Sequence, residues 1–264
     1  MIDYPKKERY TLDDFREIVA ILRHPGGCPW DQVQTHQSIR RNLLEETYEL
    51  LEGIDNEDLD LMEEELGDVL MQVLFHASIE EDAGHFSIDD VADRACKKLI
   101  FRHPHVFGDA HVECVEQELS IWDDLKRQEK RHSCYADTLN AVARTLPATW
   151  RAEKLQEKAA KAGFDWPDIS GQLSKTEEEL SEVKEALAEG EQSHIEEEIG
   201  DLLFAAVNLA RRAGVDPEFA LQAANEKFIR RFAAAESLLE GDMARHSLEE
   251  QLDAYRRAKE LCAQ

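Results

Sequence analysis

Residues 63–75 read EEELGDVLMQVLF, and this segment places carboxylates in a helix that is otherwise apolar. With about 3.6 residues per turn, Glu65, Asp68 and Gln72 share one stripe of that helix. Taking an unpaired carboxylate out of water costs on the order of several kcal/mol. The stripe therefore predicts carboxylates that are protonated, paired with cations or bound to a metal.

A second acidic helix lies just before this segment, in the sequence LLEETYELL of residues 43–51. Its acidic residues are Glu45, Glu46 and Glu49, and they adjoin an apolar face. Two antiparallel helices would bring Glu46 and Glu49 beside Glu65 and Asp68. The whole arrangement then recurs, because each acidic position has a counterpart 133 residues later. The second set comprises Glu178, Glu179, Glu182, Glu198 and Asp201. The chain therefore reads as a tandem repeat built around two acidic helix pairs.

Length and patterning predict an all-α protein of two helical-bundle repeats. The chain has 264 residues, room for two domains of about 130 residues each, and no β-type alternation runs for more than a few residues. We expect a first domain over residues 1–130 and a second over 137–264, separated by the polar stretch 127–136. The expected helices cover residues 11–23, 38–54, 57–82, 87–100, 113–131, 151–162, 170–188 and 192–213, with a long one through 225–232 and a last one from about 248.

The formal charge of −26 argues against a nucleic-acid binder or a binder of anionic membranes, since both need a cationic surface. It fits a protein that collects divalent cations. Five scattered cysteines without a C-x-x-C pair read as reduced thiols. With no signal-type or membrane-spanning run, the expected location is cytoplasmic.

The spacing of the carboxylates predicts a site for one hard cation in each repeat. Glu46 with Glu49, and Glu65 with Asp68, are i, i+3 pairs whose side chains can converge. An all-oxygen set favours Mg²⁺, Mn²⁺ or Ca²⁺ over zinc or copper. Di-iron bundles would need a Glu-x-x-His pair on two helices, and Asp68 and its counterpart Asp201 stand where such a histidine would be.

Three other interpretations of these residues are less consistent with the sequence. A solvated acidic face is the ordinary meaning of such a charge run, but duplication of all five positions argues against it. The Glu-x-x-His pair Glu191 and His194 is not expected to hold metal, because Leu61 stands at the position of His194 in the first copy. A zinc site at His103, His105, His111 and Cys114 lacks a matching second pair. The glycines Gly67 and Gly200, both mid-helix, suggest close helix approach near the acidic sites, and the alternative is that each is a tolerated small residue.

Magnesium held by carboxylates usually binds a substrate that contains phosphate. The negative charge of the phosphates is also expected to be bound by Lys and Arg side chains. The second half of the chain has cationic residues on successive helices, at Lys175, Lys227, Arg230, Arg231 and Lys259. For any one of these residues considered alone, an ordinary solvent-exposed position is an equally good interpretation. There is no G-x-x-x-x-G-K-[ST] motif, so the chain is not a P-loop enzyme.

The combined motifs resemble one known family over nearly the whole chain. Glu-Glu-x-x-Glu followed by Glu-x-x-Asp occurs twice, together with CPWD at 28–31, HPHVF at 103–107 and NEKF at 225–228. This combination closely resembles MazG, the nucleoside triphosphate pyrophosphohydrolases of the all-α type. The resemblance implies Mg²⁺-dependent hydrolysis of nucleoside triphosphates, ATP among them, to monophosphate and pyrophosphate. It also implies broad base specificity, Mn²⁺ as a possible substitute for Mg²⁺, and a helical homodimer.

The resemblance also implies roles for single residues. The metal ligands would be Glu179, Glu182, Glu198 and Asp201 in the second repeat and Glu46, Glu49, Glu65 and Asp68 in the first. Glu178 would orient or deprotonate the attacking water. The remaining substrate contacts would be Lys175, Lys227, Arg230, Arg231 and Lys259 on the phosphates, Tyr255 against the nucleoside and Asn208 on the sugar or base.

The two copies differ in their cations. Asn42 stands where the second copy has Lys175, and Phe101 stands where it has Arg230. We therefore predict that the second site carries most of the activity and that the first binds metal with a weaker or regulatory role.

Two alternative functions stay open for the chain. One is a pyrophosphohydrolase of narrow specificity, acting on phosphoribosyl-ATP or a single deoxynucleotide such as dUTP. The other is a non-catalytic module for dimerisation or nucleotide sensing.

Overall fold

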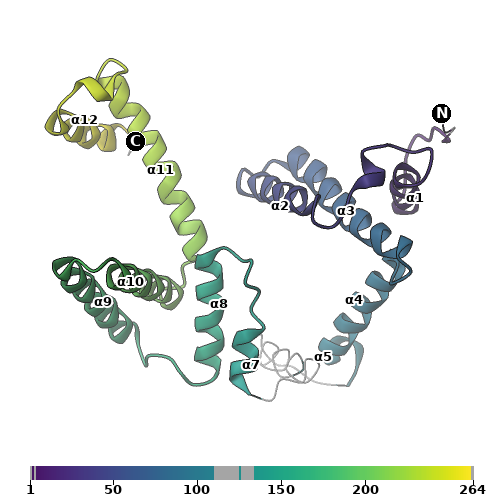
Figure 1. The fold of residues 1–264 in the computed structure, drawn as a ribbon, viewed down its shortest axis with the longest axis horizontal. Helices are drawn as coiled ribbons and strands as arrows, with labels where there is room; N and C mark the ends of the chain where they lie inside the picture. The colour runs from purple at the N-terminus through teal and green to yellow at the C-terminus, as the bar shows by residue number, and fades with distance from the viewer. Residues whose placement is uncertain (1, 3, 110–124, 126–133, 263–264) are drawn as a thin grey trace. The chain divides into compact units, whose positions relative to one another are not determined.

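The computed structural model describes residues 2, 4–109, 125 and 134–262, and every regular element in these residues is helical (Figure 1). The predicted all-α fold is confirmed for this part of the chain. The chain divides into two compact units, residues 1–126 and 127–264. Nearly all of the helix expected over 113–131, with Trp122 and Lys126, lies outside the described residues, as do His111 and Cys114. The described helices include no candidate for a membrane-spanning segment.

The first unit is built on an antiparallel pair, α2 and α3, with α1 packed on α3 (Figure 1). Its elements are α1 (Leu12–Arg23), η1 (Asp31–Val33), α2 (Arg40–Asp55), α3 (Leu59–Asp82), α4 (Ile88–Arg102) and α5 (Pro104–Phe107). The buried core lies between α1 and the C-terminal half of α3, where Val19 meets Leu74 and Phe75. The N-terminal half of α3, which carries Glu65, is left to face α2.

Helix starts in the first unit follow from local capping. Thr11 accepts a hydrogen bond from the backbone N–H of Asp14, and the Asp14 carboxylate accepts one from the backbone N–H of Thr11, which completes a capping box. Ser87 and Asp90 repeat this arrangement at the start of α4. Such caps satisfy N–H groups that a helix leaves unpaired. The predicted starts at Thr11 and Ser87 are therefore confirmed.

The second unit is built on the antiparallel pair α9 and α10, with α8 packed on α10 (Figure 1). Its elements are α7 (Tyr135–Asn140), α8 (Ala148–Lys161), α9 (Ile169–Glu189), α10 (Gln192–Arg212), α11 (Pro217–Leu238), η2 (Met243–Arg245) and α12 (Leu248–Leu261). Gly190 adopts a left-handed conformation (φ 77°) that ends α9 and lets the chain reverse into α10. The short helix α7 was not expected, because its sequence lies within and just after the polar stretch.

A separate small core joins α11 to α12. Ala235, Ala254 and Ala258 are almost fully buried there, and the small side chains let the two helices lie close together. Among the described elements, α11 packs mostly on α12 and also contacts α8 and α10. The basic residues of α11 therefore lie on a helix that packs mainly on α12.

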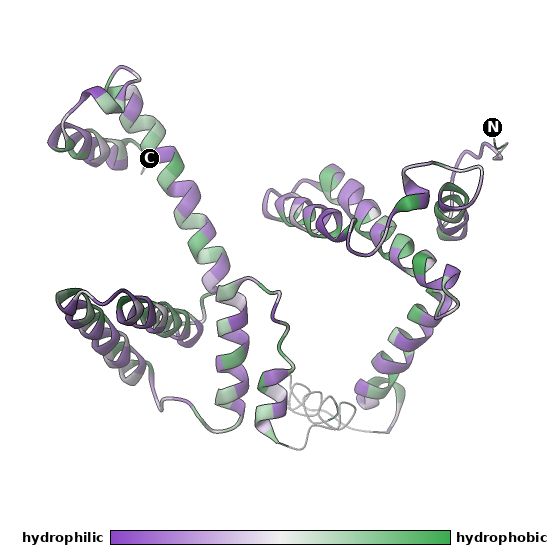
Figure 2. Ribbon diagram, viewed as in Figure 1, coloured by the Kyte–Doolittle hydropathy of each residue, from purple (hydrophilic) through white to green (hydrophobic). Residues whose placement is uncertain are grey.

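Apolar side chains remain exposed on the acidic helix pairs. Figure 2 shows hydrophobic and hydrophilic residues alternating along each helix. On α9, Leu173, Leu180 and Leu187 recur every seven residues and are 44–58% exposed. The expected close approach at Gly67 and Gly200 was wrong for the described chain, because a Cβ at either position would meet no atom within 4 Å.

Candidate metal centre

Three glutamates of the second unit converge between α9 and α10. Glu179 and Glu182 from α9 and Glu198 from α10 each offer a carboxylate oxygen, and these oxygens all lie within 4.8 Å of one another. Glu179 is buried and the other two are half-buried. The i, i+3 spacing puts the first two on one helix face, and the antiparallel turn at Gly190 brings the third across from them.

The first unit contains the same arrangement. Glu46 and Glu49 from α2 and Glu65 from α3 offer oxygens that also lie within 4.8 Å of one another. The Glu65 side chain is buried, and its Oε2 has no hydrogen-bond partner. Both triads of the repeat are thus assembled by the folding of a single chain.

Burial and mutual repulsion make these carboxylates hard to ionise. Burial raises the pKa of Glu46, and the neighbouring charges of Asp68, Glu49 and Glu65 raise it further. Burial likewise raises the pKa of Glu65, with Glu49 and Asp68 adding to the effect. A divalent cation with a preference for oxygen ligands would relieve both the repulsion and the unpaired Oε2. The donor set therefore fits a hard metal ion.

The same effects act in the second unit with one difference. Burial raises the pKa of Glu182, Lys175 opposes this rise, and Glu179 and Glu198 reinforce it. Lys175 Nζ lies 2.7 Å from Glu178 Oε1 and 2.9 Å from Glu179 Oε1. These carboxylates raise the pKa of the Lys175 ammonium group well above its usual range. A fixed cation thus reaches this cluster, whereas the first unit has Asn42 at that position.

The two aspartates predicted as further ligands lie at the margin of the clusters. Asp68 is half-buried, one turn beyond Glu65, and its charge acts on Glu46 and Glu65. Asp201 is exposed, one turn beyond Glu198. Neither belongs to the set of oxygens that lie within 4.8 Å of one another among the described residues.

His194, which was not expected to belong to the site, contacts Glu198 of the second cluster. Its Nε2 lies 3.2 Å from Glu198 Oε1, and its Nδ1 lies 2.9 Å from Glu189 Oε2. The hydrogen bond with Glu189 and the charge of Glu198 raise the pKa of His194. The i, i+4 spacing from His194 to Glu198 was the available signal for this pair.

The remaining predicted substrate residues gather on α11 and α12. Lys227, Arg230 and Arg231 lie on α11 and Tyr255 and Lys259 on α12. The Tyr255 ring lies 6.0 Å from that of Phe228 on α11, and Lys259 Nζ lies 5.4 Å from the Tyr255 ring centre. The structure thus brings Tyr255 and Lys259 together, and all five residues lie on helices other than the two that hold the carboxylates.

Asn208 lies on α10, two turns beyond Asp201, in a chain of hydrogen bonds. Its Nδ2 donates to Gln172 Oε1 over 2.6 Å, and Arg211 Nε donates to Asn208 Oδ1 over 2.9 Å. Gln172 is buried on α9 and donates to the backbone oxygen of Ala205. The amide of Asn208 therefore helps to hold α9 and α10 together.

Comparison with known proteins agrees with this arrangement. The MazG nucleotide pyrophosphohydrolase domain matches residues 34–107 and 170–234, and each segment contains one acidic helix pair. A nucleoside triphosphate pyrophosphohydrolase/pyrophosphatase MazG of Thermotoga maritima is 48% identical over 86% of this chain and 88% of its own length. A nucleoside triphosphate pyrophosphohydrolase of Escherichia coli K12 is 42% identical over the same shares. An uncharacterized protein, YabN, of Bacillus subtilis 168 is 49% identical over 95% of this chain and 52% of its own length.

Proposed function

The chain belongs to the MazG nucleotide pyrophosphohydrolase family, and we propose that it hydrolyses nucleoside triphosphates to nucleoside monophosphate and pyrophosphate in a Mg²⁺-dependent reaction. The observation that carries this proposal is the three-glutamate cluster, present twice, with a buried unpaired oxygen in one copy. We assign most of the activity to the second repeat, because Lys175 is ion-paired with Glu179 of that three-glutamate cluster. In the first repeat Arg41 is paired with Glu45, outside the three-glutamate cluster.

The residues that would hold the metal in the second repeat are Glu179, Glu182, Glu198 and Asp201. Mg²⁺, or Mn²⁺ in its place, would supply positive charge that stabilises the phosphates and the pyrophosphate leaving group. Asp201 is exposed in the structure, one turn beyond Glu198, and a change of its rotamer would complete the set. The first repeat would hold metal through Glu46, Glu49, Glu65 and Asp68, with a weaker or regulatory role.

Glu178 would position the attacking water. Its side chain is 57% exposed and is ion-paired with Lys175, beside the buried Glu179. In this reaction the water oxygen bonds to phosphorus, the bond between the α- and β-phosphates breaks, and pyrophosphate leaves. The proton of the water passes to the carboxylate of Glu178 and then to solvent. No covalent enzyme intermediate is required.

Cationic side chains would hold the triphosphate. Lys175 already lies at the carboxylates and would move from Glu178 to a phosphate oxygen when substrate binds. Further cations would come from Lys227, Arg230, Arg231 and Lys259, with Tyr255 against the nucleoside and Asn208 near the sugar or base. These contacts require α11 and α12 to approach an acidic helix pair of their own chain or of a second copy.

We propose a homodimer as the active form. The exposed leucines of α9 recur at seven-residue spacing, as in helices that pack against other helices. Gly67 and Gly200 have open space around them, which a helix of a second copy could occupy. Light scattering coupled to size-exclusion chromatography would measure the mass in solution. A monomer at working concentration would contradict this part of the proposal.

Product analysis tests the reaction itself. The protein would be incubated with Mg²⁺ and a panel of standard and modified nucleoside triphosphates, and the products separated by ion-exchange chromatography. We expect monophosphate plus pyrophosphate from several bases, with turnover abolished by Glu182→Gln. Diphosphate plus phosphate, or nucleotide binding without turnover, would contradict the proposal. Turnover of a single base only would replace broad specificity by the narrow alternative.

A further inference from the structure

Three histidines and one glutamate form a histidine cluster in the first unit. His36 Nδ1 lies 2.7 Å from His76 Nδ1, and the two rings are close to parallel. Glu80 Oε1 lies 2.5 Å from His36 Nε2, and Glu80 Oε2 lies 2.6 Å from His85 Nδ1. His76 follows Glu65 by eleven residues on α3, about 16 Å along the helix axis. The histidine cluster is therefore separate from the carboxylates assigned to Mg²⁺.

Local structure fixes the position of His36 in the turn before α2. The backbone N–H of Thr35 donates to the hydroxyl of Ser38, and the backbone N–H of Ser38 donates back to the hydroxyl of Thr35. Ile39, directly after this turn, is buried in the core with Phe75 of α3. The core thus anchors the turn on α3, beside the residue that follows Phe75, which is His76.

The other members of the histidine cluster lie at the C-terminal end of α3. His76 and Glu80 have i, i+4 spacing, which places them on one face of the helix. Gly84 then adopts a left-handed conformation (φ 75°) that reverses the chain, and the backbone N–H of His85 donates to the backbone oxygen of Glu80. The ring of His85 is thereby returned to the Glu80 carboxylate.

The hydrogen bonds of Glu80 decide which nitrogen of His36 carries a hydrogen. The bonds from His85 and His36 lower the pKa of Glu80, so its carboxylate is ionised and can only accept. His36 Nε2 therefore carries a hydrogen, and Nδ1 of the neutral ring keeps a lone pair that faces His76. Burial and the neighbouring His36 lower the pKa of His76, so that ring is neutral at neutral pH. Neutral imidazole is the form that binds metal ions.

This geometry is the one that imidazole ligands adopt at metal sites. A histidine that binds a metal through one nitrogen usually donates its other N–H to a carboxylate, as His36 does to Glu80. Two imidazole nitrogens on one tetrahedral zinc ion lie about 3.3 Å apart. The rings of His36 and His76 therefore need to separate only slightly to admit an ion. Imidazole suits Zn²⁺, Ni²⁺ or Cu²⁺, whereas Mg²⁺ prefers oxygen ligands.

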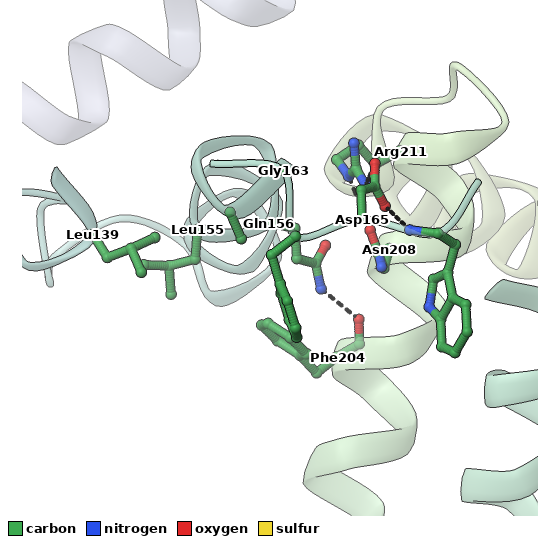
Figure 3. Close-up of a pocket in the computed structure, with 11 residues that line it drawn as sticks. Leu139, Leu155, Gln156, Gly163, Asp165, Phe204, Asn208 and Arg211 are labelled. Carbon is green, nitrogen blue, oxygen red and sulfur yellow. Dashed lines mark hydrogen bonds and ion pairs between the residues drawn. The ribbon is translucent and has the colours of Figure 1, made fainter. Parts of the chain in front are cut away.

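The second repeat has apolar residues where the first has the histidine cluster. The counterparts of His36, His76 and Glu80, each 133 residues later, are Ile169, Leu209 and Ala213. Hydrogen bonds of amides join the second helix pair near these positions, because Asn208 on α10 donates to Gln172 on α9 and accepts from Arg211 (Figure 3). The histidine cluster is therefore not part of the machinery that the two repeats share.

We propose that His36 and His76 bind a divalent transition metal ion such as Zn²⁺ through their Nδ1 atoms, with Glu80 orienting His36 and water completing the coordination. His85 would in turn hold the Glu80 carboxylate. The ion would tie the turn before α2 to the C-terminal half of α3 and so stabilise the first acidic helix pair. This site does not depend on the proposed hydrolysis, and its test does not require turnover.

Calorimetric titration of the metal-free full chain with Zn²⁺ tests the proposal. Saturating Mg²⁺ is present throughout to compete for the carboxylates. We expect one Zn²⁺ per chain at this site, with affinity weakened by at least about tenfold in His76→Leu, which copies Leu209 of the second repeat. His24→Gln is the matched control, because His24 is another histidine of the first unit paired with a carboxylate, and it should bind Zn²⁺ as the wild type does.

A second variant keeps both imidazole ligands. Glu80→Gln retains an acceptor for the N–H of His36 but removes the charge, and it should weaken Zn²⁺ binding by about tenfold. Zn²⁺ should also raise the melting temperature of the wild type by more than that of either variant. Glu80→Gln decides the question if His76→Leu fails to fold.

Three results would overturn the proposal. One is equal affinity for Zn²⁺ in the wild type, His76→Leu and Glu80→Gln. Another is the absence of Zn²⁺ binding by the wild type in saturating Mg²⁺, which would identify the contact of His36 with His76 as a hydrogen bond alone. The third is Zn²⁺ binding that both of these variants retain and that Glu49→Gln with Glu182→Gln removes, which would place the ion at the carboxylates.

Discussion

The Nδ1 atoms of His36 and His76 lie 2.7 Å apart, and the two rings are stacked within 14° of parallel. His36 lies in the turn before α2 and His76 on α3, so this contact joins the two acidic helices of the first unit. Glu80 accepts hydrogen bonds from His36 and His85. A short contact between two ring nitrogens requires that one of them carries no hydrogen.

This pair predicts that the first unit loses stability as the pH falls below neutral. Burial and the neighbouring His36 lower the pKa of His76. Its folded pKa is thus below the unfolded value, so the unfolded chain takes up the proton first and stability decreases as pH falls through about 6.5. The pKa of Glu80 is also lowered, by its bonds to His85 and His36, but its effect begins only at more acidic pH, near the unfolded carboxyl value.

Thermal unfolding between pH 8 and pH 5.5 measures this effect. The decrease in melting temperature should be smaller in His76→Phe, which keeps a ring but cannot titrate. His24→Gln changes a more exposed histidine of the same unit and should retain the wild-type slope. A slope that survives in His76→Phe would show that another group is responsible.

Divalent cations should stabilise the protein more at neutral than at acidic pH. Burial raises the pKa values of Glu46, Glu65 and Glu182 in the folded protein. Without metal, these groups therefore stabilise the folded state fully below the pKa of an unfolded carboxyl group. That stabilisation is lost as the pH rises through their folded pKa values. At pH 7.5 and about a hundred times Kd, Mg²⁺ should add roughly 2.7 kcal/mol per site to the free energy of unfolding. At pH 4.5 protons compete and the gain should be small.

Calorimetric melting with and without Mg²⁺ checks this prediction. The double variant Glu49→Gln with Glu182→Gln should lose most of the gain at pH 7.5. Glu185→Gln, an exposed carboxylate on α9, is the control and should behave as the wild type. A gain that is the same at both pH values would argue against metal binding by these carboxylates.

The two repeats should contribute unequally to turnover. Glu182→Gln removes a ligand beside Lys175 and should reduce kcat by about a hundredfold or more, a typical effect of losing charge stabilisation at a reacting group. Glu49→Gln removes the matching ligand in the first repeat, which has Asn42 in place of Lys175. We expect this substitution to decrease kcat by less than about threefold. Steady-state kinetics with one nucleoside triphosphate compares the kcat values of the two variants. Equal decreases in kcat would refute the assignment of most activity to the second repeat.

Helices and acidic clusters could be predicted because they depend on local pattern. Capping residues such as Thr11 and Ser87 and the i, i+3 carboxylates act within a few residues of chain. The pairing of His36 with His76 joins residues forty positions apart, and no periodicity indicates it. Gln156 on α8 donates a hydrogen bond to the backbone oxygen of Phe204, forty-eight residues away, and no local pattern indicates this contact. The packing of α11 on α12 is non-local in the same way.

Lys175 should contribute mainly to substrate binding. It lies against Glu178 and Glu179, and removing it would leave the triphosphate without the nearest cation of the second site. Lys175→Asn, which copies Asn42 of the first repeat, should raise KM by about tenfold. The reciprocal Asn42→Lys in a Glu182→Gln background tests the first site and should increase its residual turnover. An unchanged KM in Lys175→Asn would show that this lysine serves only the ion pairs seen in the structure.

His194 should compete with metal for Glu198. Its hydrogen bond to Glu189 and the charge of Glu198 raise its pKa, so the imidazolium and its stabilising pairing persist at neutral pH and are lost as pH rises through the raised value. His194→Leu, which copies Leu61 of the first repeat, should therefore increase Mn²⁺ affinity about twofold to fivefold at pH 6.5 and leave it nearly unchanged at pH 9. Electron paramagnetic resonance of Mn²⁺ in a Glu49→Gln background isolates the second site. A weaker affinity at pH 9 would instead make His194 a metal ligand, because a neutral imidazole binds metal and a protonated one does not.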